Sequence, residues 1–371
     1  MTELHGTCDG RFTEVRETLA GFLASGADVG ASAAVYVDGE PVVDLWAGHA
    51  DPERDLLWEC DTITNVFSTT KTMTALCALI LADRGDLDLD APVAAYWPEF
   101  AAAGKAGVLV RHLLSHTAGL PSFDAPLTVE DLYDWDRATA LLAAQTPRWR
   151  PGAECGYHVV TQGFLVGEVV RRITGRTLGA FFAEEVAAPL GADFHIGLPE
   201  REDPRVAPII PPEPARPAAA TGGRGAGEPL SPVIDPAVAN TAAWRRAELP
   251  SGNGHGNARS VAAVQSVLAC GGTADGVRLL SPAGCERALE QQYHGVDRLL
   301  GVPMRYGLGY GLYGEGGRTC GWGGWGGSLV FIDFDARMVV AYVMNRMIDG
   351  GGLTDERGFG IVLAAYGGLT A

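Results

Sequence analysis

Apolar and polar residues follow two different periods along this chain, and each period indicates a type of element. Over residues 11–25, apolar side chains recur every three or four positions, which predicts an amphipathic N-terminal helix. Two apolar, β-branched runs follow at 31–37 and 41–46, and the turn-forming pair Asp38-Gly39 separates them. This pattern predicts a β-hairpin.

The most uniformly apolar helical pattern of the chain begins close to Ser68. From Met73 to Leu81, apolar side chains keep helical spacing with little polar interruption, which is typical of a helix buried on most sides. Gly85 follows, and glycine can take the left-handed conformation that ends a helix. Ser68 and Lys71 stand three positions apart at the N-terminal end, so both can lie on one face. The helix dipole favours a developing oxyanion at this end.

Residues 86–250 have a different character, because helical patterns there are separated by long loops rich in Gly, Pro and Asp. A short helix is expected within 111–121, where Gly and Pro stop it, and a longer one at 164–175. The stretch 199–236 is dense in Pro, Ala and Gly, so we expect a loop outside the core. A mobile lid and a plain surface excursion are both compatible with this composition.

The last third of the chain returns to strands and regular helices. A helix is predicted at 258–269, strands at 306–313, 328–334 and 338–344, and a closing helix at about 355–366. Strands at both ends with helices between them predict an α+β fold. In this fold, one antiparallel sheet is flanked by the N- and C-terminal helices.

The same pattern predicts two units with the functional site between them. Residues 1–75 and 255–371 would form the sheet domain, and 76–254 a mainly helical domain that carries the loop at 199–236. With 371 residues the chain is longer than a typical single domain, and 47% apolar residues are ample for a large core.

Charge and cysteine usage narrow the class of function. A formal net charge of −17 and a pI near 4.8 argue against nucleic-acid binding, which requires clustered Lys and Arg. No apolar run approaches about 18 residues and no basic, apolar leader begins the chain, so we expect a cytoplasmic protein without membrane contact. Seven scattered cysteines indicate reduced thiols. No His or Cys cluster has metal-ligand spacing, so neither a metal nor a cofactor is expected.

A Ser-x-x-Lys spacing alone is not specific, because a serine at a helix N-terminus followed by a surface lysine produces the same pattern. Further motifs accompany it in order along the chain. They are His-Leu-Leu-Ser-His-Thr-Ala-Gly-Leu-Pro at 112–121, Pro151-Gly152 with Gly156-Tyr157, Asn-Gly-His-Gly-Asn-Ala-Arg at 253–259, and Gly-Gly-Ser at 326–328 with Ala-Tyr-Val-Met-Asn-Arg at 341–346. Together these motifs, spread over nearly the whole chain, resemble the serine β-lactamase and penicillin-binding-protein-like hydrolases. The resemblance is strongest to the class C-like branch that includes the family VIII carboxylesterases.

The resemblance implies a catalytic trio. Ser68 would be the nucleophile, Lys71 its proton acceptor, and Tyr157 the group that passes the proton to the leaving group. A serine hydroxyl is a poor nucleophile until its proton is taken, and a lysine can take it only when burial lowers the lysine pKa. A tyrosine beside a cationic lysine could then be poised towards the phenolate form.

The third motif of the family is expected on the edge strand of the sheet near residue 322. In this sequence it reads Trp322-Gly323-Gly324-Trp325, similar to the tryptophan or histidine variants of the esterases. The resemblance implies an oxyanion hole made by the backbone N–H groups of Ser68 and Trp325, and glycine allows a substrate to approach the backbone closely. The side chains of Trp322 and Trp325 could equally contact substrate or pack the loop.

Three departures from the β-lactamase pattern bear on the substrate. Val159 stands where the family's Tyr-x-Asn motif has asparagine, Phe123 where class C enzymes carry glutamine, and Trp322 where they carry lysine. The polar groups that would hold an amide side chain and a carboxylate are therefore apolar, which costs recognition of β-lactams. We expect a small, uncharged ester or thioester with apolar bulk as the substrate.

These observations predict a serine hydrolase that cleaves carboxylic esters through an acyl-enzyme on Ser68. The sequence does not separate it from an acyltransferase that passes the acyl group to an alcohol or amine, because that choice depends on water exclusion and acceptor binding. The remaining alternatives are a weak β-lactamase or peptidase, or a non-catalytic domain that keeps the fold. The intact Ser68, Lys71 and Tyr157 argue against loss of catalysis.

Overall fold

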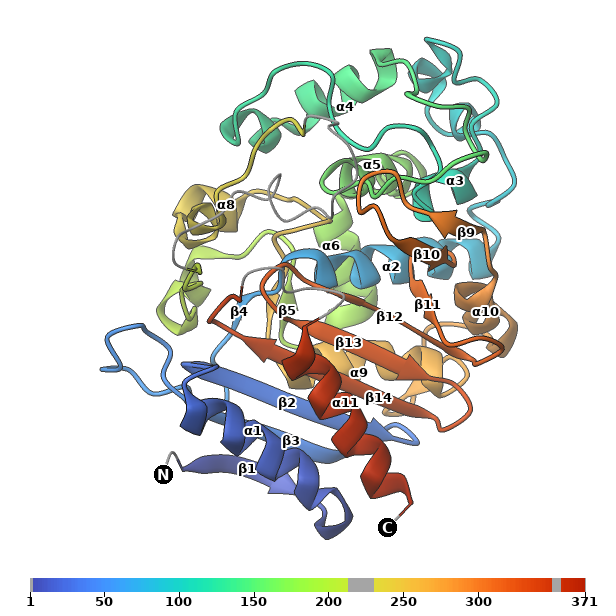
Figure 1. The fold of residues 1–371 in the computed structure, drawn as a ribbon. Coiled ribbons are helices and arrows are strands. Elements are labelled where there is room, and N and C mark those ends of the chain that lie inside the picture. Colours follow the sequence, from blue (N-terminus) through green and yellow to red (C-terminus); the bar gives the residue numbers. More distant parts are fainter. Residues whose placement is uncertain (1–2, 213–229, 349–354, 371) are drawn as a thin grey trace.

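The computed structural model describes residues 3–212, 230–348 and 355–370. Within these residues the fold is built on a nine-stranded antiparallel sheet (Figure 1). In spatial order its strands are β1 (Leu4–Cys8), β3 (Glu40–Gly48), β2 (Gly30–Val37), β14 (Met338–Met344), β13 (Leu329–Asp333), β12 (Thr319–Gly323), β11 (Gly311–Tyr313), β10 (Pro303–Tyr306) and β9 (Tyr293–Val296). The pairing of β2 with β14 joins the N-terminal and C-terminal segments, and the predicted α+β fold is confirmed.

Helices cover both faces of this sheet and form a further layer beyond it. They are α1 (Thr13–Ser25), α2 (Thr70–Arg84), α3 (Val110–Leu114), α4 (Trp135–Ala144), α5 (Thr161–Thr174), α6 (Leu178–Phe182), α8 (Ala242–Arg246), α9 (Ala258–Ala269), α10 (Pro282–Glu286) and α11 (Glu356–Leu369). Two small sheets accompany them. One has three strands, β4 (Thr64–Asn65), β6 (His255–Gly256) and β5 (Phe194–His195), and the other has two, β7 (Thr273–Ala274) and β8 (Val277–Arg278).

The sheet separates two apolar cores. Successive side chains of a strand point to opposite faces, so Ala33 and Val35 of β2 face one core while Ala34 faces the other. Helices α1 and α11 cover the first core, and α9 covers the second (Figure 1). Helix α2 lies on the α9 side, next to the layer that contains α3, α4 and α5 (Figure 1).

Helix α2 is enclosed on all sides, as its apolar pattern predicts. All residues from Thr70 to Leu81 are buried, and the neighbours of the helix include α5, α6 and α10. Gly85 follows the helix with φ +84°, and its amide bonds the carbonyls of Leu81 and Ala82. Close packing on every side therefore holds the N-terminal end of α2 in place.

Two predicted segments differ from the observed structure. The run 306–313 is not one strand, because the chain reverses in its middle and forms the β10–β11 pair. Gly309 lies in this turn with φ +88°, and a Cβ there would lie 2.2 Å from the Cβ of Ala75, so only glycine fits. The helix predicted within 111–121 ends at Leu114.

The stretch 199–236 is partly core, which corrects the expectation of a loop outside it. Ala207 and Ile209 are 1% and 3% exposed. The amide of Ala207 donates to the carbonyl of Ile63, so this segment packs on the chain that leads into α2. Residues 213–229 of this stretch lie outside the described part of the chain. Nothing in the fold tests the predicted domain boundaries, which stay a prediction.

Two properties of the described residues concern membrane contact and the state of the cysteines. None of their helices is both long enough and apolar enough to cross a membrane. All seven cysteines of the chain are described, and each is a free thiol, as their scattered spacing predicted.

Candidate active site

The chain enters α2 through a tight 3-10 turn, Phe67–Thr69, which carries Ser68. Phe67 has φ +42°, a left-handed conformation that a residue with a side chain adopts only under constraint, and such strain concentrates at functional sites. Its ring packs edge-on against Trp325, with 5.3 Å between the ring centroids. Ser68 is left partly exposed while the residues around it in this turn are buried.

Ser328 connects this turn by hydrogen bonds to the loop 324–328, which follows β12. Its hydroxyl donates to the carbonyl of Val66 at 2.8 Å and lies 2.9 Å from the hydroxyl of Thr69. Gly324 donates its amide to the carbonyl of Ser328 at 2.7 Å. A Cβ on Gly324 would lie 2.1 Å from the carbonyl oxygen of Val66, so the loop can approach the turn only because this residue is glycine.

Lys71 lies one helical turn beyond Ser68 and is 1% exposed. Its Nζ is 3.1 Å from Ser68 Oγ, and it donates to the carbonyls of Val159 at 2.7 Å and Ser251 at 2.8 Å. These three partners are neutral, so none offsets the cost of burying an ammonium, and burial lowers the pKa of Lys71 well below its usual range. A neutral amine can give its two hydrogens to the carbonyls and accept the Ser68 proton on its lone pair.

Tyr157 stands beside this pair on a segment without regular secondary structure. Nζ of Lys71 lies 4.8 Å from the centre of its ring. The Tyr157 hydroxyl is hydrogen-bonded to Ser68, and it accepts from Nε1–H of Trp322 at 3.2 Å. Burial raises the pKa of Tyr157 more than these hydrogen bonds lower it. Burial therefore favours the phenol form of Tyr157 over the phenolate that a cationic lysine would favour.

Three further rings pack around Tyr157. His116 and Trp322 have centroids 4.9 Å and 5.2 Å from that of Tyr157, and Tyr306 lies 5.0 Å from His116. Nδ1 of His116 accepts the backbone amide of His158 at 3.1 Å. Burial lowers the pKa of His116 well below its usual range, so this ring contributes packing and a hydrogen bond but no charge.

The third motif begins at the end of β12 and continues into the loop that follows it. Strand β12 is not the edge strand that the sequence predicted, because β11 pairs beyond it. That pairing stops at Gly311 and Gly321. Trp322 and Gly323 continue past it, and the indole of Trp322 reaches Tyr157. The motif therefore occupies a local edge, created where the short strand β11 ends.

The other predicted pocket residues have different surroundings. Phe123 is 1% exposed and packs edge-on against Phe164 in the helical layer. Val159 is partly buried near Tyr157, and its carbonyl holds Lys71. Trp325 is only partly buried. The contacts of these side chains with substrate, and the oxyanion hole at the Ser68 and Trp325 amides, stay predictions.

Sequence reasoning missed two groups next to the predicted trio. One is the Ser251 carbonyl that binds Lys71, and a backbone carbonyl carries no signature in a sequence. The other is Asp297, whose carboxylate accepts the backbone amide of Tyr157 at 3.1 Å. As a single acidic residue in a short turn, it gives no pattern that would distinguish it from a surface aspartate.

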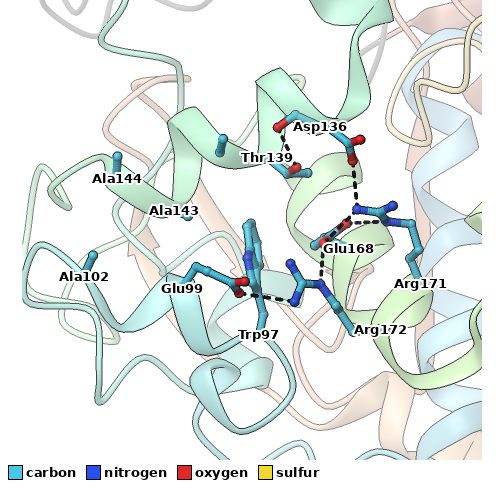
Figure 2. Close-up of a pocket in the computed structure, with 11 residues that line it drawn as sticks. Trp97, Glu99, Ala102, Asp136, Thr139, Ala143, Ala144, Glu168, Arg171 and Arg172 are labelled. Carbon is cyan, nitrogen blue, oxygen red and sulfur yellow. Dashed lines mark hydrogen bonds and ion pairs between the residues drawn. The ribbon is translucent and has the colours of Figure 1, made fainter.

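A separate pocket of about 400 Å³ lies in the helical layer between α4 and α5 (Figure 2). Arg171 pairs there with Asp136 and Glu168. Arg172 pairs with Glu168 and Glu99. These charges compensate one another, and the lining includes none of the predicted catalytic residues. Neither in this pocket nor in the rest of the described chain is a group of three or more His, Cys, Asp or Glu side chains arranged to hold a metal.

A serine hydroxyl, a buried amine with a lowered pKa and a phenol thus meet where α2 approaches the sheet. This arrangement is suited to serine acyl-transfer chemistry. The chain belongs to the beta-lactamase family, whose model, described as Beta-lactamase, matches residues 15–361. The family resemblance carried by the sequence motifs is therefore confirmed.

Several known proteins are similar to this chain over most of its length. It is 37% identical over 371 residues to the esterase/beta-lactamase LipL of Mycobacterium tuberculosis (strain ATCC 25618 / H37Rv), covering 95% of this chain and 86% of that protein. A crystal structure of a family VIII carboxylesterase matches with a TM-score of 0.91 and 44% identity, covering 98% and 99% of the two chains. A penicillin-binding protein homologue from Caulobacter crescentus matches with a TM-score of 0.88 and 39% identity, covering 99% of this chain and 100% of that chain.

Proposed function

We propose that this protein is a serine carboxylesterase that forms an acyl-enzyme on Ser68. The observation that carries the proposal is the environment of Lys71, whose Nζ is 3.1 Å from Ser68 Oγ and is otherwise bonded to two backbone carbonyls. Burial without a carboxylate partner lowers the pKa of this amine, and this favours the neutral form that a serine nucleophile requires as its base. The names of the similar proteins, an esterase/beta-lactamase and a family VIII carboxylesterase, support ester hydrolysis.

In the acylation step, Ser68 Oγ attacks the ester carbonyl while its proton passes to Lys71. The tetrahedral oxyanion is stabilised by the backbone N–H groups of Ser68 and Trp325. As the C–O bond of the ester breaks, the phenol of Tyr157 gives its proton to the departing alkoxide, and the proton held on Lys71 restores the phenol. Water then attacks the acyl carbonyl with the same base, which releases the acid and regenerates Ser68.

The surroundings of the trio support an uncharged substrate. Trp322 stands where the class C enzymes carry a lysine, so the cation is missing at this position. The indole N–H of Trp322 donates to the Tyr157 hydroxyl and is therefore not available to a substrate carboxylate. Val159 presents an aliphatic side chain where an amide would bind a polar acyl substituent. A substrate carboxylate would lose its water there without gaining a charge partner, whereas a short acyl chain would lose only apolar hydration.

On this basis we expect short-chain aryl esters to be turned over with a kcat/KM at least about 100-fold above that of a cephalosporin. Initial rates on 4-nitrophenyl butyrate and on a chromogenic cephalosporin, measured with one enzyme preparation, check this. Efficient cephalosporin hydrolysis would contradict the role given to the apolar substitutions. The same assay with added alcohol or amine separates hydrolysis from acyl transfer, because transfer yields a new ester or amide instead of the free acid.

A second prediction concerns the charge of Lys71, and the composition makes it measurable. The chain has only two lysines, Lys71 and Lys105, and both are buried. Burial lowers the pKa of Lys105 to about 8. In protein with isotope-labelled lysine side chains, we expect two amine signals, with the Lys71 signal titrating well below the usual lysine range.

The direction in which kcat/KM changes with pH follows from the role of Lys71 as a base. Lys71 must be deprotonated to act as base, so kcat/KM rises as the pH is raised through the pKa of Lys71 and is lost on the acid side. The variant Lys105→Met assigns the two signals and should leave the acid limb of the pH profile in place. A Lys71 signal that titrates near the usual lysine range would contradict the proposed base.

A further inference from the structure

Asp297 is a fully buried carboxylate in the turn between β9 and β10 (Figure 1). Among the described residues it accepts five hydrogen bonds, and every donor is neutral. They are the amides of Leu299 and Leu300, each at 2.8 Å, the amide of Tyr157 at 3.1 Å, the hydroxyl of Tyr306 at 2.9 Å and the thiol of Cys155 at 3.3 Å. A buried charge is costly unless it is fully hydrogen-bonded, so this carboxylate depends on its donors and they depend on it.

These donors belong to separate parts of the chain. Two lie in the turn that contains Asp297, one lies on β10, and two lie on the segment that carries the tyrosine of the proposed trio. The amide of Arg298 also donates to the carbonyl of Cys155 at 2.9 Å, so the turn and this segment lie side by side. Through one carboxylate, the β9–β10 turn is joined to the backbone of Tyr157.

The opposite side of the segment is held by His116. The amide of Gly156 donates to its carbonyl at 3.1 Å, and the amide of His158 donates to its Nδ1 at 3.1 Å. Tyr157 therefore has His116 bonded to its two neighbours and Asp297 bonded to its own amide. Because this segment is neither helix nor strand, its position depends on these side-chain and turn contacts instead of on a regular ladder.

We propose that Asp297 is a positioning residue for proton transfer, which holds the Tyr157 backbone and, through Tyr306, the packed rings so that the Tyr157 phenol stays in hydrogen-bonding reach of Ser68. The inference rests on the proposed esterase function. Asp297 touches neither the substrate nor the reacting atoms, and it acts through Tyr157. Displacement of a catalytic group by about 1 Å can cost about 100-fold in rate, so loss of this anchor should weaken proton donation without removing the nucleophile.

Two esters of the same acid separate this role from a merely structural one. In 4-nitrophenyl butyrate the leaving group is a stable anion that departs with little help, whereas the alkoxide of ethyl butyrate must be protonated as it leaves. We expect Asp297→Ala to lower kcat/KM for ethyl butyrate by about 100-fold and that for 4-nitrophenyl butyrate by less than about fivefold, per active site labelled by a fluorophosphonate. Asp297→Asn should recover most of the loss, because its amide oxygen can still accept from the backbone N–H groups.

Asp28→Asn is the matched control. Asp28 is also a buried carboxylate, 1% exposed, and it accepts the hydroxyl of Tyr342 at 2.6 Å and a guanidinium N–H of Arg357 at 2.7 Å. It has no contact with the proposed trio, so its replacement should lower the melting temperature and leave the ratio of the two ester rates unchanged.

The outcomes are distinct. If Asp297→Ala slows both esters equally, or if Asp297→Asn changes the ratio as much as Asp297→Ala, the positioning role is wrong while the esterase function stands. A wild-type protein inactive on both esters would overturn the proposed function and this inference with it. Should Asp297→Ala fail to fold, Asp297→Ser carries the same test, because its shorter hydroxyl can reach fewer of the five donors.

Discussion

Replacing Ser68 by alanine is expected to abolish ester turnover, lowering kcat by roughly 10⁶-fold, the order seen when a serine nucleophile is removed from a hydrolase. The reason is chemical, since the substitution removes the only oxygen that Lys71 is positioned to activate in the proposed site. Hydrolysis of 4-nitrophenyl butyrate and the intact mass after fluorophosphonate treatment check the prediction together. Wild-type protein should gain one adduct, and Ser68→Ala should gain none.

Ser266→Ala is the control for this variant. Ser266 is a buried serine on α9, 2% exposed, and its hydroxyl donates to the carbonyl of Ala263 at 2.7 Å. Its loss should leave turnover and labelling unchanged. More than about one per cent residual activity in Ser68→Ala, or an adduct on another residue, would mean that the nucleophile lies elsewhere.

Tyr157→Phe is expected to give the second largest loss, about 10²- to 10⁴-fold in kcat for alkyl esters, the usual contribution of a general acid. The ring remains, so its packing against His116 and Trp322 is kept, and only the hydroxyl is lost. The loss should be much smaller for 4-nitrophenyl esters, because their leaving group needs little protonation. Comparing kcat/KM for ethyl and 4-nitrophenyl butyrate measures this difference.

Tyr313→Phe serves as its control, because the hydroxyl of Tyr313 is buried without a hydrogen-bond partner among the described residues. Removing that hydroxyl should change neither ester rate. If Tyr157→Phe stays within tenfold of the wild type on ethyl butyrate, another group donates the proton, and the role assigned to Asp297 is lost as well.

Comparing Tyr157→Phe with Asp297→Ala tests how the proton reaches the leaving alkoxide. Tyr157→Phe removes the donor, and Asp297→Ala leaves the donor present but unanchored. Both should raise the ratio of 4-nitrophenyl to ethyl ester rates, the first more than the second. A reversed order would mean that Asp297 does not act through the Tyr157 hydroxyl alone, which contradicts the positioning role.

Local pattern was enough to predict several elements and one reactive pair. The turn pair Asp38-Gly39 between two apolar runs predicted the β2–β3 hairpin, because its preferred turn determines the pairing of the strands. The continuous apolar run before Gly85 predicted a buried helix. Because residues three apart share a helix face, the spacing of Ser68 and Lys71 predicted that their side chains can lie on one face, and the structure places Nζ of Lys71 3.1 Å from Ser68 Oγ.

Patterns failed where distant segments decide the local structure. The run 306–313 has the alternation of one strand, yet contact of Gly309 with Ala75 of α2 accompanies a reversal in its middle. The composition of 199–236 is that of a loop, yet Ile209 is buried beneath neighbouring segments. Composition describes what a segment prefers in isolation, and burial depends on what the rest of the chain places against it.

By itself, the sequence determined the hairpin, the apolar helix and the placement of Ser68 and Lys71 on one helix face, because each depends on residues close together along the chain. The tertiary structure decided the lowered pKa of Lys71, since the same Ser-x-x-Lys motif on an exposed helix would leave the amine with its usual pKa. It also brought Tyr157 and Asp297 to the start of that helix through hydrogen bonds between segments far apart along the chain. Desolvation and long-range contact have no local period, and therefore only the folded chain reveals them.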